Sequence, residues 1–136
     1  MTKHQRNVGL FMQKAGQMIP LTQKVKKLRA TLILEETKEV LEALGYKITG
    51  NCSGGVGLSV TRALDNDHLI KELCDLIVVT TGTAIAFGID IELYQDLVDQ
   101  NNLEKIGKSE VRADGKIIKP KGFKSPLERG NWPKLI

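Results

Sequence analysis

The chain has 136 residues, of which 41% are hydrophobic and 26% charged, a composition typical of one globular domain that is large enough to bury a core. Its formal net charge is +4, and only 4% of its residues are aromatic, which argues against a protein that stacks nucleic-acid bases on aromatic side chains. Its two cysteines lack metal-site spacing, and its first residues hold no apolar run of signal-peptide type. We therefore expect a cytoplasmic protein with free thiols.

The first half of the chain predicts two helices and a hairpin. Apolar residues at helical spacing predict a short helix over residues 4–16. Thr22 is a suitable N-cap for a second helix, which runs to Leu44 and stops at Gly45. Two β-branched runs then flank a glycine-rich turn, which indicates a hairpin or lid. The turn contains "GGVG" but no Gly-Lys-Ser/Thr follows it, so a phosphate loop of that type is excluded.

The second half predicts two further helices and a basic tail. A third helix is expected from Asn66 or Asp67 to Phe87; from Leu73 onwards it is apolar almost all round, which implies that a second subunit covers one face. The polar residues within this stretch make it a poor membrane span. A fourth helix follows from Asp90 to Gly107.

Residues 107–136 carry eight Lys or Arg residues against three acidic residues. Within them, Asp114-Gly115 separates two strand-like runs, which is typical of a hairpin turn. A basic tail suggests an anionic partner, such as nucleic acid, a membrane or a phosphorylated small molecule, or else a solvated tail that aids solubility.

Acidic residues interrupt the apolar face of the second predicted helix. With residues spaced about 100° apart around the axis, Glu36 and Glu39 fall within this face and Glu35 lies at its edge. The rest of the face is formed by Val25, Leu28, Leu32, Val40 and Ala43.

The third predicted helix repeats the pattern with Glu72 and Asp75, which are three residues apart on a face that leads inward. Two antiparallel helices would bring both acidic pairs into one interior. Four buried carboxylates cannot stay ionised without partners, because desolvation and mutual repulsion oppose it. Divalent cations remove this conflict, and an all-oxygen site suits Mg²⁺ or Mn²⁺.

An alternative interpretation is a set of salt bridges on a solvated face. It suits Glu72, which has Lys71 and His68 nearby, but it suits Glu36 and Glu39 poorly because their neighbours are aliphatic. A di-iron bundle would need Glu-x-x-His on two helices. Neither histidine of the chain lies three residues after a glutamate, so the di-iron interpretation is disfavoured.

"EETKE" (residues 35–39) and "ELCD" (residues 72–75) together resemble the EExxE…ExxD motif of the all-α nucleoside triphosphate pyrophosphohydrolases, a superfamily with MazG-like enzymes, dimeric dUTPases and phosphoribosyl-ATP pyrophosphohydrolases. Further segments resemble a MazG-related, phosphoribosyl-ATP-pyrophosphohydrolase-like group: "FMQKAGQMIP", "GTAIAFGIDIELY", "NNLEKIGK" and "DGKIIKPKGFKSP". The glycine-rich hairpin makes the segment between the two motifs longer than in compact MazG domains.

The resemblance implies an all-α bundle of four to five helices, to which the sequence patterns described above add a short β-hairpin insertion and a basic C-terminal tail. It implies a homodimer or a dimer of dimers. On this basis we expect a helical catalytic domain over residues 1–107, and a tail over residues 108–136 that packs on the same domain or on its partner.

The resemblance also implies the chemistry, in which water attacks the α-phosphorus of a nucleoside triphosphate to give the monophosphate and pyrophosphate. By position, Glu36, Glu39, Glu72 and Asp75 would hold Mg²⁺, with Mn²⁺ as a possible substitute. Glu35 would help to bind a further ion or orient the attacking water, so that Glu35, Glu36 and Glu39 form the expected catalytic group.

Other residues are candidates for substrate binding. Asn102 and Lys105 match the family's "NxxK" pattern, in which the amide can bind a base or ribose and the ammonium a phosphate. A lysine near a helix C-terminus is also stabilised by the helix dipole, which is a purely structural alternative for Lys105. Arg29, at the edge of the apolar face, is a candidate for a buried role with the acids or the substrate. The tail lysines are candidates to close over phosphates, namely Lys116, Lys119 and Lys121.

These expectations favour an enzyme of nucleotide-pool sanitation or of dUTP or dCTP hydrolysis, without membrane or nucleic-acid partners. An alternative with the same site is phosphoribosyl-ATP hydrolysis in histidine biosynthesis. An alternative of another class is a non-enzymatic nucleic-acid-binding module that uses the basic tail. That last interpretation predicts salt-dependent binding and leaves the buried carboxylates unexplained.

Overall fold

A computed structural model describes residues 1–50, 57–106, 110–130 and 132–133. The contacts among residues divide the chain into two compact units, Met1–Gly88 and Ile89–Ile136. The fourth predicted helix therefore groups with the tail rather than with the first three helices. The domain boundary expected at residue 107 stays a prediction.

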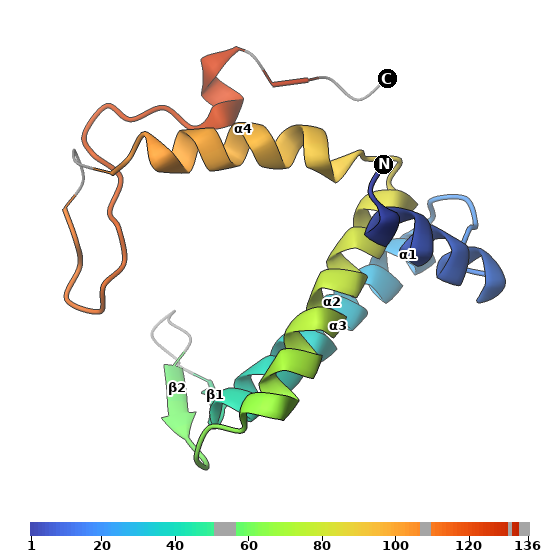
Figure 1. Ribbon diagram of the computed structural model, residues 1–136, viewed down its shortest axis with the longest axis horizontal. Coiled ribbons are helices and arrows are strands. Elements are labelled where there is room, and N and C mark those ends of the chain that lie inside the picture. The colour runs from blue at the N-terminus through green and yellow to red at the C-terminus, as the bar shows by residue number, and fades with distance from the viewer. Residues whose placement is uncertain (51–56, 107–109, 131, 134–136) are drawn as a thin grey trace. The chain divides into compact units, whose positions relative to one another are not determined.

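The first unit is built on a pair of long helices. Helix α2 (Gln23–Leu44) and helix α3 (Asn66–Ala86) lie side by side and antiparallel, and helix α1 (Lys3–Lys14) packs against α3 (Figure 1). The predicted caps of α2 are confirmed, because the Thr22 side chain accepts a hydrogen bond from the backbone N–H of Val25 and Gly45 ends the helix with a φ of 89°. A Cβ at position 45 would lie 2.0 Å from a backbone carbonyl oxygen, so this helix end requires glycine.

The core of this unit lies where α1 and α2 meet α3. The fully or nearly fully buried apolar side chains are Val8, Met12, Val25, Val40, Ala43 and Ala84. Gly82 of α3 is buried where a Cβ would lie 3.3 Å from the Met12 sulfur and 3.6 Å from a Val8 methyl group. The missing side chain at position 82 thus lets α1 approach α3 closely.

The predicted hairpin is confirmed by strands β1 (Tyr46–Thr49) and β2 (Gly57–Val60), which pair antiparallel. Most of the glycine-rich turn falls on residues 51–56, which lie outside the described residues. The N-cap of α3 is Asp65 rather than Asn66 or Asp67, and its carboxylate accepts from the backbone N–H of His68 at 3.0 Å. All three residue types are good N-caps, so the sequence pattern could not choose among them.

The second unit contains helix α4 (Ile91–Leu103) and a short 3₁₀ helix, η1 (Pro126–Arg129). The helix ends earlier than the predicted Gly107. Trp132 packs against Tyr94 of α4, with 4.9 Å between ring centroids, and so attaches the tail to this helix. The predicted tail turn is present at Gly115 (φ 89°), but the runs beside it share one β-bridge, Val111 with Ile117, rather than two strands.

The part of the chain that the structure describes thus holds four α-helices and one small antiparallel sheet. This part of the chain is mostly helical, as predicted. Among the described helices, none is by itself long and apolar enough to cross a membrane; α3 and α4, taken as one bent pair, meet that test by length and composition alone.

Candidate metal centre

Three carboxylates from two helices converge in the first unit. Glu36 and Glu39 lie one turn apart on α2, and Glu72 lies on α3; one oxygen of each is within 4.8 Å of the others. Glu72 is 1% exposed, Glu36 is half-buried and Glu39 is exposed. The cluster therefore has a buried floor and an accessible side, as a site needs if an ion is to enter it.

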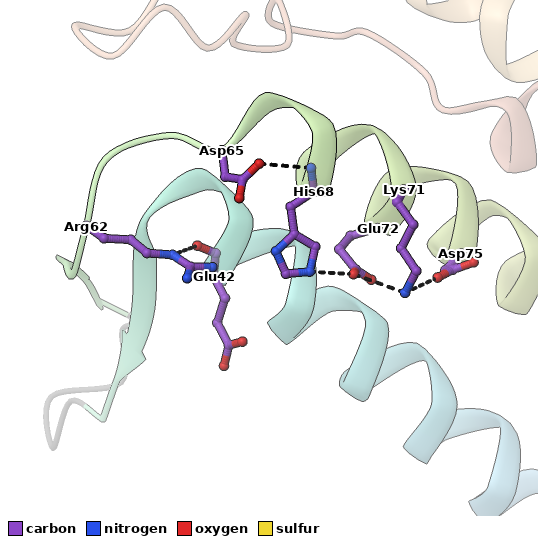
Figure 2. Close-up of polar contacts among 7 residues, drawn as sticks. All are labelled: Glu42, Arg62, Asp65, His68, Lys71, Glu72 and Asp75. Carbon is purple, nitrogen blue, oxygen red and sulfur yellow. Dashed lines mark hydrogen bonds and ion pairs between the residues drawn. The ribbon is translucent and has the colours of Figure 1, made fainter.

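Two side chains of α3 hold one oxygen of Glu72 (Figure 2). Its Oε1 accepts from His68 Nε2 at 2.9 Å and from Lys71 Nζ at 3.1 Å. Burial alone would raise the pKa of Glu72, but the hydrogen bonds from Lys71 and with Glu39, together with the charges of Lys71 and His68, hold this pKa below its ordinary value. Glu72 is thus kept ionised although it is buried.

The opposite effect acts on Glu39. A hydrogen bond with Glu72 and the negative charge of that carboxylate raise the pKa of Glu39 above its ordinary value, and the charge of Glu36 adds to the shift. The hydrogen bond with Glu72 and the nearby negative charges thus favour the protonated form of Glu39 more than in a free glutamate, although this side chain is exposed.

Two oxygens of the cluster lack partners. Glu36 Oε2 and Glu72 Oε2 are buried and accept no hydrogen bond from the described residues. Buried carboxylate oxygens without donors are costly, and a bound divalent cation would satisfy both. Since all the donor atoms are carboxylate oxygens, the residues present fit a hard divalent cation.

Asp75 lies beside this cluster rather than within it. Its Oδ2 accepts from Lys71 Nζ at 2.8 Å, and Lys71 thus bridges Asp75 and Glu72 (Figure 2). Glu35 is exposed on α2. The salt-bridge alternative for Glu72 is therefore present in the structure together with the carboxylate cluster, and the predicted ligand set stays a prediction.

A cavity of about 230 Å³ adjoins the carboxylates between α1, α2 and α3. Glu36 and Asp75 line it together with apolar side chains and Arg29. Arg29 is 4% exposed and donates from Nη2 to Gln17 Oε1 at 2.8 Å. Burial lowers the pKa of its guanidinium. Arg29 is thus buried in the wall of this cavity, and its predicted role with the acids or the substrate stays a prediction.

A family model described as phosphoribosyl-ATP pyrophosphohydrolase matches residues 12–102, more than half of the chain. The chain belongs to this family. The match contains all five acidic residues of the predicted motif, and the predicted membership of the MazG-like all-α pyrophosphohydrolase superfamily is confirmed. A comparison with curated proteins finds no match.

Membership of the phosphoribosyl-ATP pyrophosphohydrolase family makes the chain a hydrolase that acts on phosphorus-containing anhydrides. Divalent metals commonly serve such enzymes, and a cluster of three acidic residues, Glu36, Glu39 and Glu72, is present in this structure.

The second unit carries the other predicted substrate residues. Lys105 Nζ donates to Asn102 Oδ1 at 2.8 Å, so the two residues of the "NxxK" pattern contact each other. Lys116, Lys119 and Lys121 are exposed. Lys121 also lines an open cavity of about 830 Å³ within this unit, a feature that the sequence did not indicate.

The sequence predicts no role for Gln17, and it indicates Lys71 and His68 only as possible salt-bridge partners of Glu72. The spacing of His68 and Lys71, each four residues before an acidic residue, is a usable helical signal for these contacts. Gln17 follows α1 and contacts α2 through Arg29, so no local spacing could reveal it.

Proposed function

We propose that the chain is a Mg²⁺-dependent nucleoside triphosphate pyrophosphohydrolase that releases pyrophosphate and a nucleoside monophosphate. The observation that carries this proposal is the cluster of Glu36, Glu39 and Glu72, with two buried, unpartnered oxygens, beside a cavity. The substrates that we favour are non-standard or surplus nucleotides, including dUTP and dCTP.

In this proposal Glu36, Glu39 and Glu72 hold the cation, and Mn²⁺ can replace Mg²⁺. A divalent cation supplies charge neutralisation of the triphosphate and a water of lowered pKa. Asp75 would be a further ligand if it exchanged its contact with Lys71 for the cation. The exposed carboxylate of Glu35 orients the attacking water toward the α-phosphorus.

His68 and Lys71 hold Glu72 in the metal-free protein. Both donate to Oε1, which leaves the buried Oε2 without a partner among the described residues and available as a ligand atom. For the second unit we propose contacts to the substrate from Asn102 and Lys105, and phosphate binding by the three tail lysines Lys116, Lys119 and Lys121. The lysines in this set offer donors and positive charge only, which suits an anionic substrate.

We also propose that the working form is a homodimer or a dimer of dimers. Ile70, Leu73 and Ile77 share one face of α3 and are 62%, 43% and 54% exposed. A contiguous exposed apolar stripe on a helix is typical of an interface. A second copy of the chain is the occupant expected from the sequence pattern, and light scattering of the purified protein tests this.

A second candidate is hydrolysis of phosphoribosyl-ATP itself, which the description of the family supports at least as well. It would use the same carboxylates and the same attack on the α-phosphorus. The two candidates differ only in what the substrate carries beyond the triphosphate, so a substrate panel separates them.

The test is pyrophosphate release from canonical and modified nucleoside triphosphates and from phosphoribosyl-ATP, with Mg²⁺ and with EDTA, in ¹⁸O-labelled water. We expect metal-dependent release from one substrate class, with the label in the monophosphate, and loss of release in Glu36→Gln. Release of inorganic phosphate alone, or label in the pyrophosphate, would contradict attack at the α-phosphorus. Equal rates in EDTA would contradict the metal site.

A further inference from the structure

The cavity beside the carboxylates is sized for part of a nucleotide. Its volume of about 230 Å³ is below the range of about 300–1,000 Å³ usual for drug-sized ligands. Phe11, Leu32, Val78 and Val79 give it apolar walls. Such a space suits one flat ring system rather than a whole nucleoside triphosphate.

The polar groups that line this cavity fall into two sets. Glu36 and Asp75 are the carboxylates that the proposed function assigns to the cation. The remaining pair is Arg29 with Gln17. It is therefore this pair that is available to a ring bound in the cavity.

This pair presents donors only. A guanidinium has five N–H groups and no acceptor, so the oxygen of Gln17 must be the atom that faces Arg29. The Gln17 amide nitrogen is then left with its two N–H groups. Arg29 Nε is buried and donates to none of the described residues. A buried donor without an acceptor is unfavourable, so this wall is matched by a ligand that offers acceptors.

The fold fixes Arg29 in this place. A Cβ at position 82 would lie 2.9 Å from Arg29 Nη1, so glycine is the residue that leaves room for the guanidinium. Arg29 is also 4% exposed, which limits its freedom to turn toward solvent. The donor wall is thus rigid, as selective recognition requires.

We infer that this cavity binds the nucleobase, and that Arg29 with Gln17 selects bases with a carbonyl oxygen at position 4 of a pyrimidine or position 6 of a purine. Uracil, thymine, hypoxanthine and guanine carry that acceptor, whereas cytosine and adenine carry an amino group there. This inference rests on the proposed function. It narrows the substrate class to keto-base nucleoside triphosphates.

The test compares pairs that differ only in this group, dUTP with dCTP and dITP with dATP. Non-hydrolysable α,β-imido analogues are titrated by calorimetry with Mg²⁺, and kcat/KM is measured for the triphosphates. We expect the keto member of each pair to be favoured about tenfold to a hundredfold, the range for one bidentate base contact. Equal affinities within both pairs, from a protein that hydrolyses them, would overturn the inference alone. Binding and hydrolysis of none of them would overturn the proposed function as well.

Two variants separate recognition from folding. Arg29→Met keeps much of the buried volume but removes the donors, and should bring the dUTP-to-dCTP ratio close to one. Gln17→Glu is the safer change because Gln17 is only half-buried, and it replaces amide donors with acceptors. It should lower the ratio at least tenfold, whereas Gln13→Glu, an exposed matched control on α1, should leave it unchanged. An unchanged ratio in Gln17→Glu would overturn the inference.

Discussion

The two units of the chain differ in how deeply their charged side chains are buried. In Met1–Gly88 the key charges are buried and incompletely satisfied, as shown by Glu72 at 1% exposure and Arg29 at 4%, each with a buried atom that has no partner among the described residues. In Ile89–Ile136 the ion pairs among the described residues lie at the surface, as in Arg112 with Asp114.

This difference indicates where the chemistry lies. Exposed ion pairs contribute little to stability and need no ligand. Buried groups left without partners are unfavourable in the free protein, and they persist where a ligand completes them. This contrast supports the proposal that the metal site lies in the first unit, whereas an ion pair of the second unit such as Arg129 with Glu104 needs no ligand.

The largest effect is expected from Glu72→Gln. The amide keeps the shape of the side chain but removes the charge from the buried floor of the cluster. We expect kcat/KM to fall about 10²–10³-fold, the range for losing one preorganised electrostatic contact. Glu42→Gln, an exposed acid on α2, is the matched control and should stay near wild type. Equal losses in both variants would show that charge in general, not the cluster, is responsible.

Lys71→Met should act in the opposite direction on metal binding. Lys71 holds Asp75 and contributes a positive charge next to the cluster, so its removal should tighten Mn²⁺ binding about fivefold, as for loss of an exposed ion pair. The metal-free protein should melt at a lower temperature, because Glu72 loses a counter-ion. Lys27→Met, an exposed lysine on α2, controls for net charge. Weaker Mn²⁺ binding in Lys71→Met would contradict the proposed exchange.

The pKa shifts predict proton release on metal binding. The pKa of Glu39 is raised by Glu72, so its proton stabilises the metal-free fold at low pH, and this contribution is lost as the pH rises through the raised pKa. The pKa of Glu72 is lowered, so its ionised form stabilises the fold above the ordinary pKa, and this contribution is lost as the pH falls through the lowered pKa. A cation needs Glu39 ionised, so affinity should rise with pH through that window. Calorimetry in two buffers of different ionisation enthalpy should show release, and Glu39→Gln should abolish it.

The smallest effect is expected in the tail. Hydrogen bonds from Arg112 lower the pKa of Asp114 to about 2, so this pair stabilises the turn above the ordinary pKa and is lost only as the pH falls toward 2. Arg112→Met should return the pKa of Asp114 to its ordinary range, as measured by NMR titration. An Asp114 that already titrates normally in the wild type would show that the pair does not persist in solution.

The sequence predicted those features that depend on local periodicity. The apolar spacing predicted the helices, Thr22 and Gly45 marked the ends of α2, and the spacing of Glu36 and Glu39 placed both carboxylates on one face. Their meeting with Glu72 followed from an antiparallel helix pair, which the hairpin between α2 and α3 enforces.

Features that depend on tertiary contacts were not predictable in this way. Asp75 lies three residues after Glu72, the spacing expected of a second metal ligand on α3. Its carboxylate instead pairs with Lys71, one turn earlier on the same helix. The contact of Gln17 with Arg29 joins a loop to a helix, and the role of Gly82 becomes clear only when α1, α2 and α3 are assembled. Local sequence patterns predict single helices, whereas these contacts depend on how α1, α2 and α3 pack together.

The most direct test of the account is a titration of Mn²⁺ into the protein without substrate, followed by electron paramagnetic resonance, for wild type, Glu72→Gln and Glu42→Gln. The account predicts a saturable site in wild type and in Glu42→Gln, displaced by Mg²⁺ and lost in a folded Glu72→Gln variant. Unchanged Mn²⁺ binding in Glu72→Gln would contradict the claim that the three-carboxylate cluster is the metal centre.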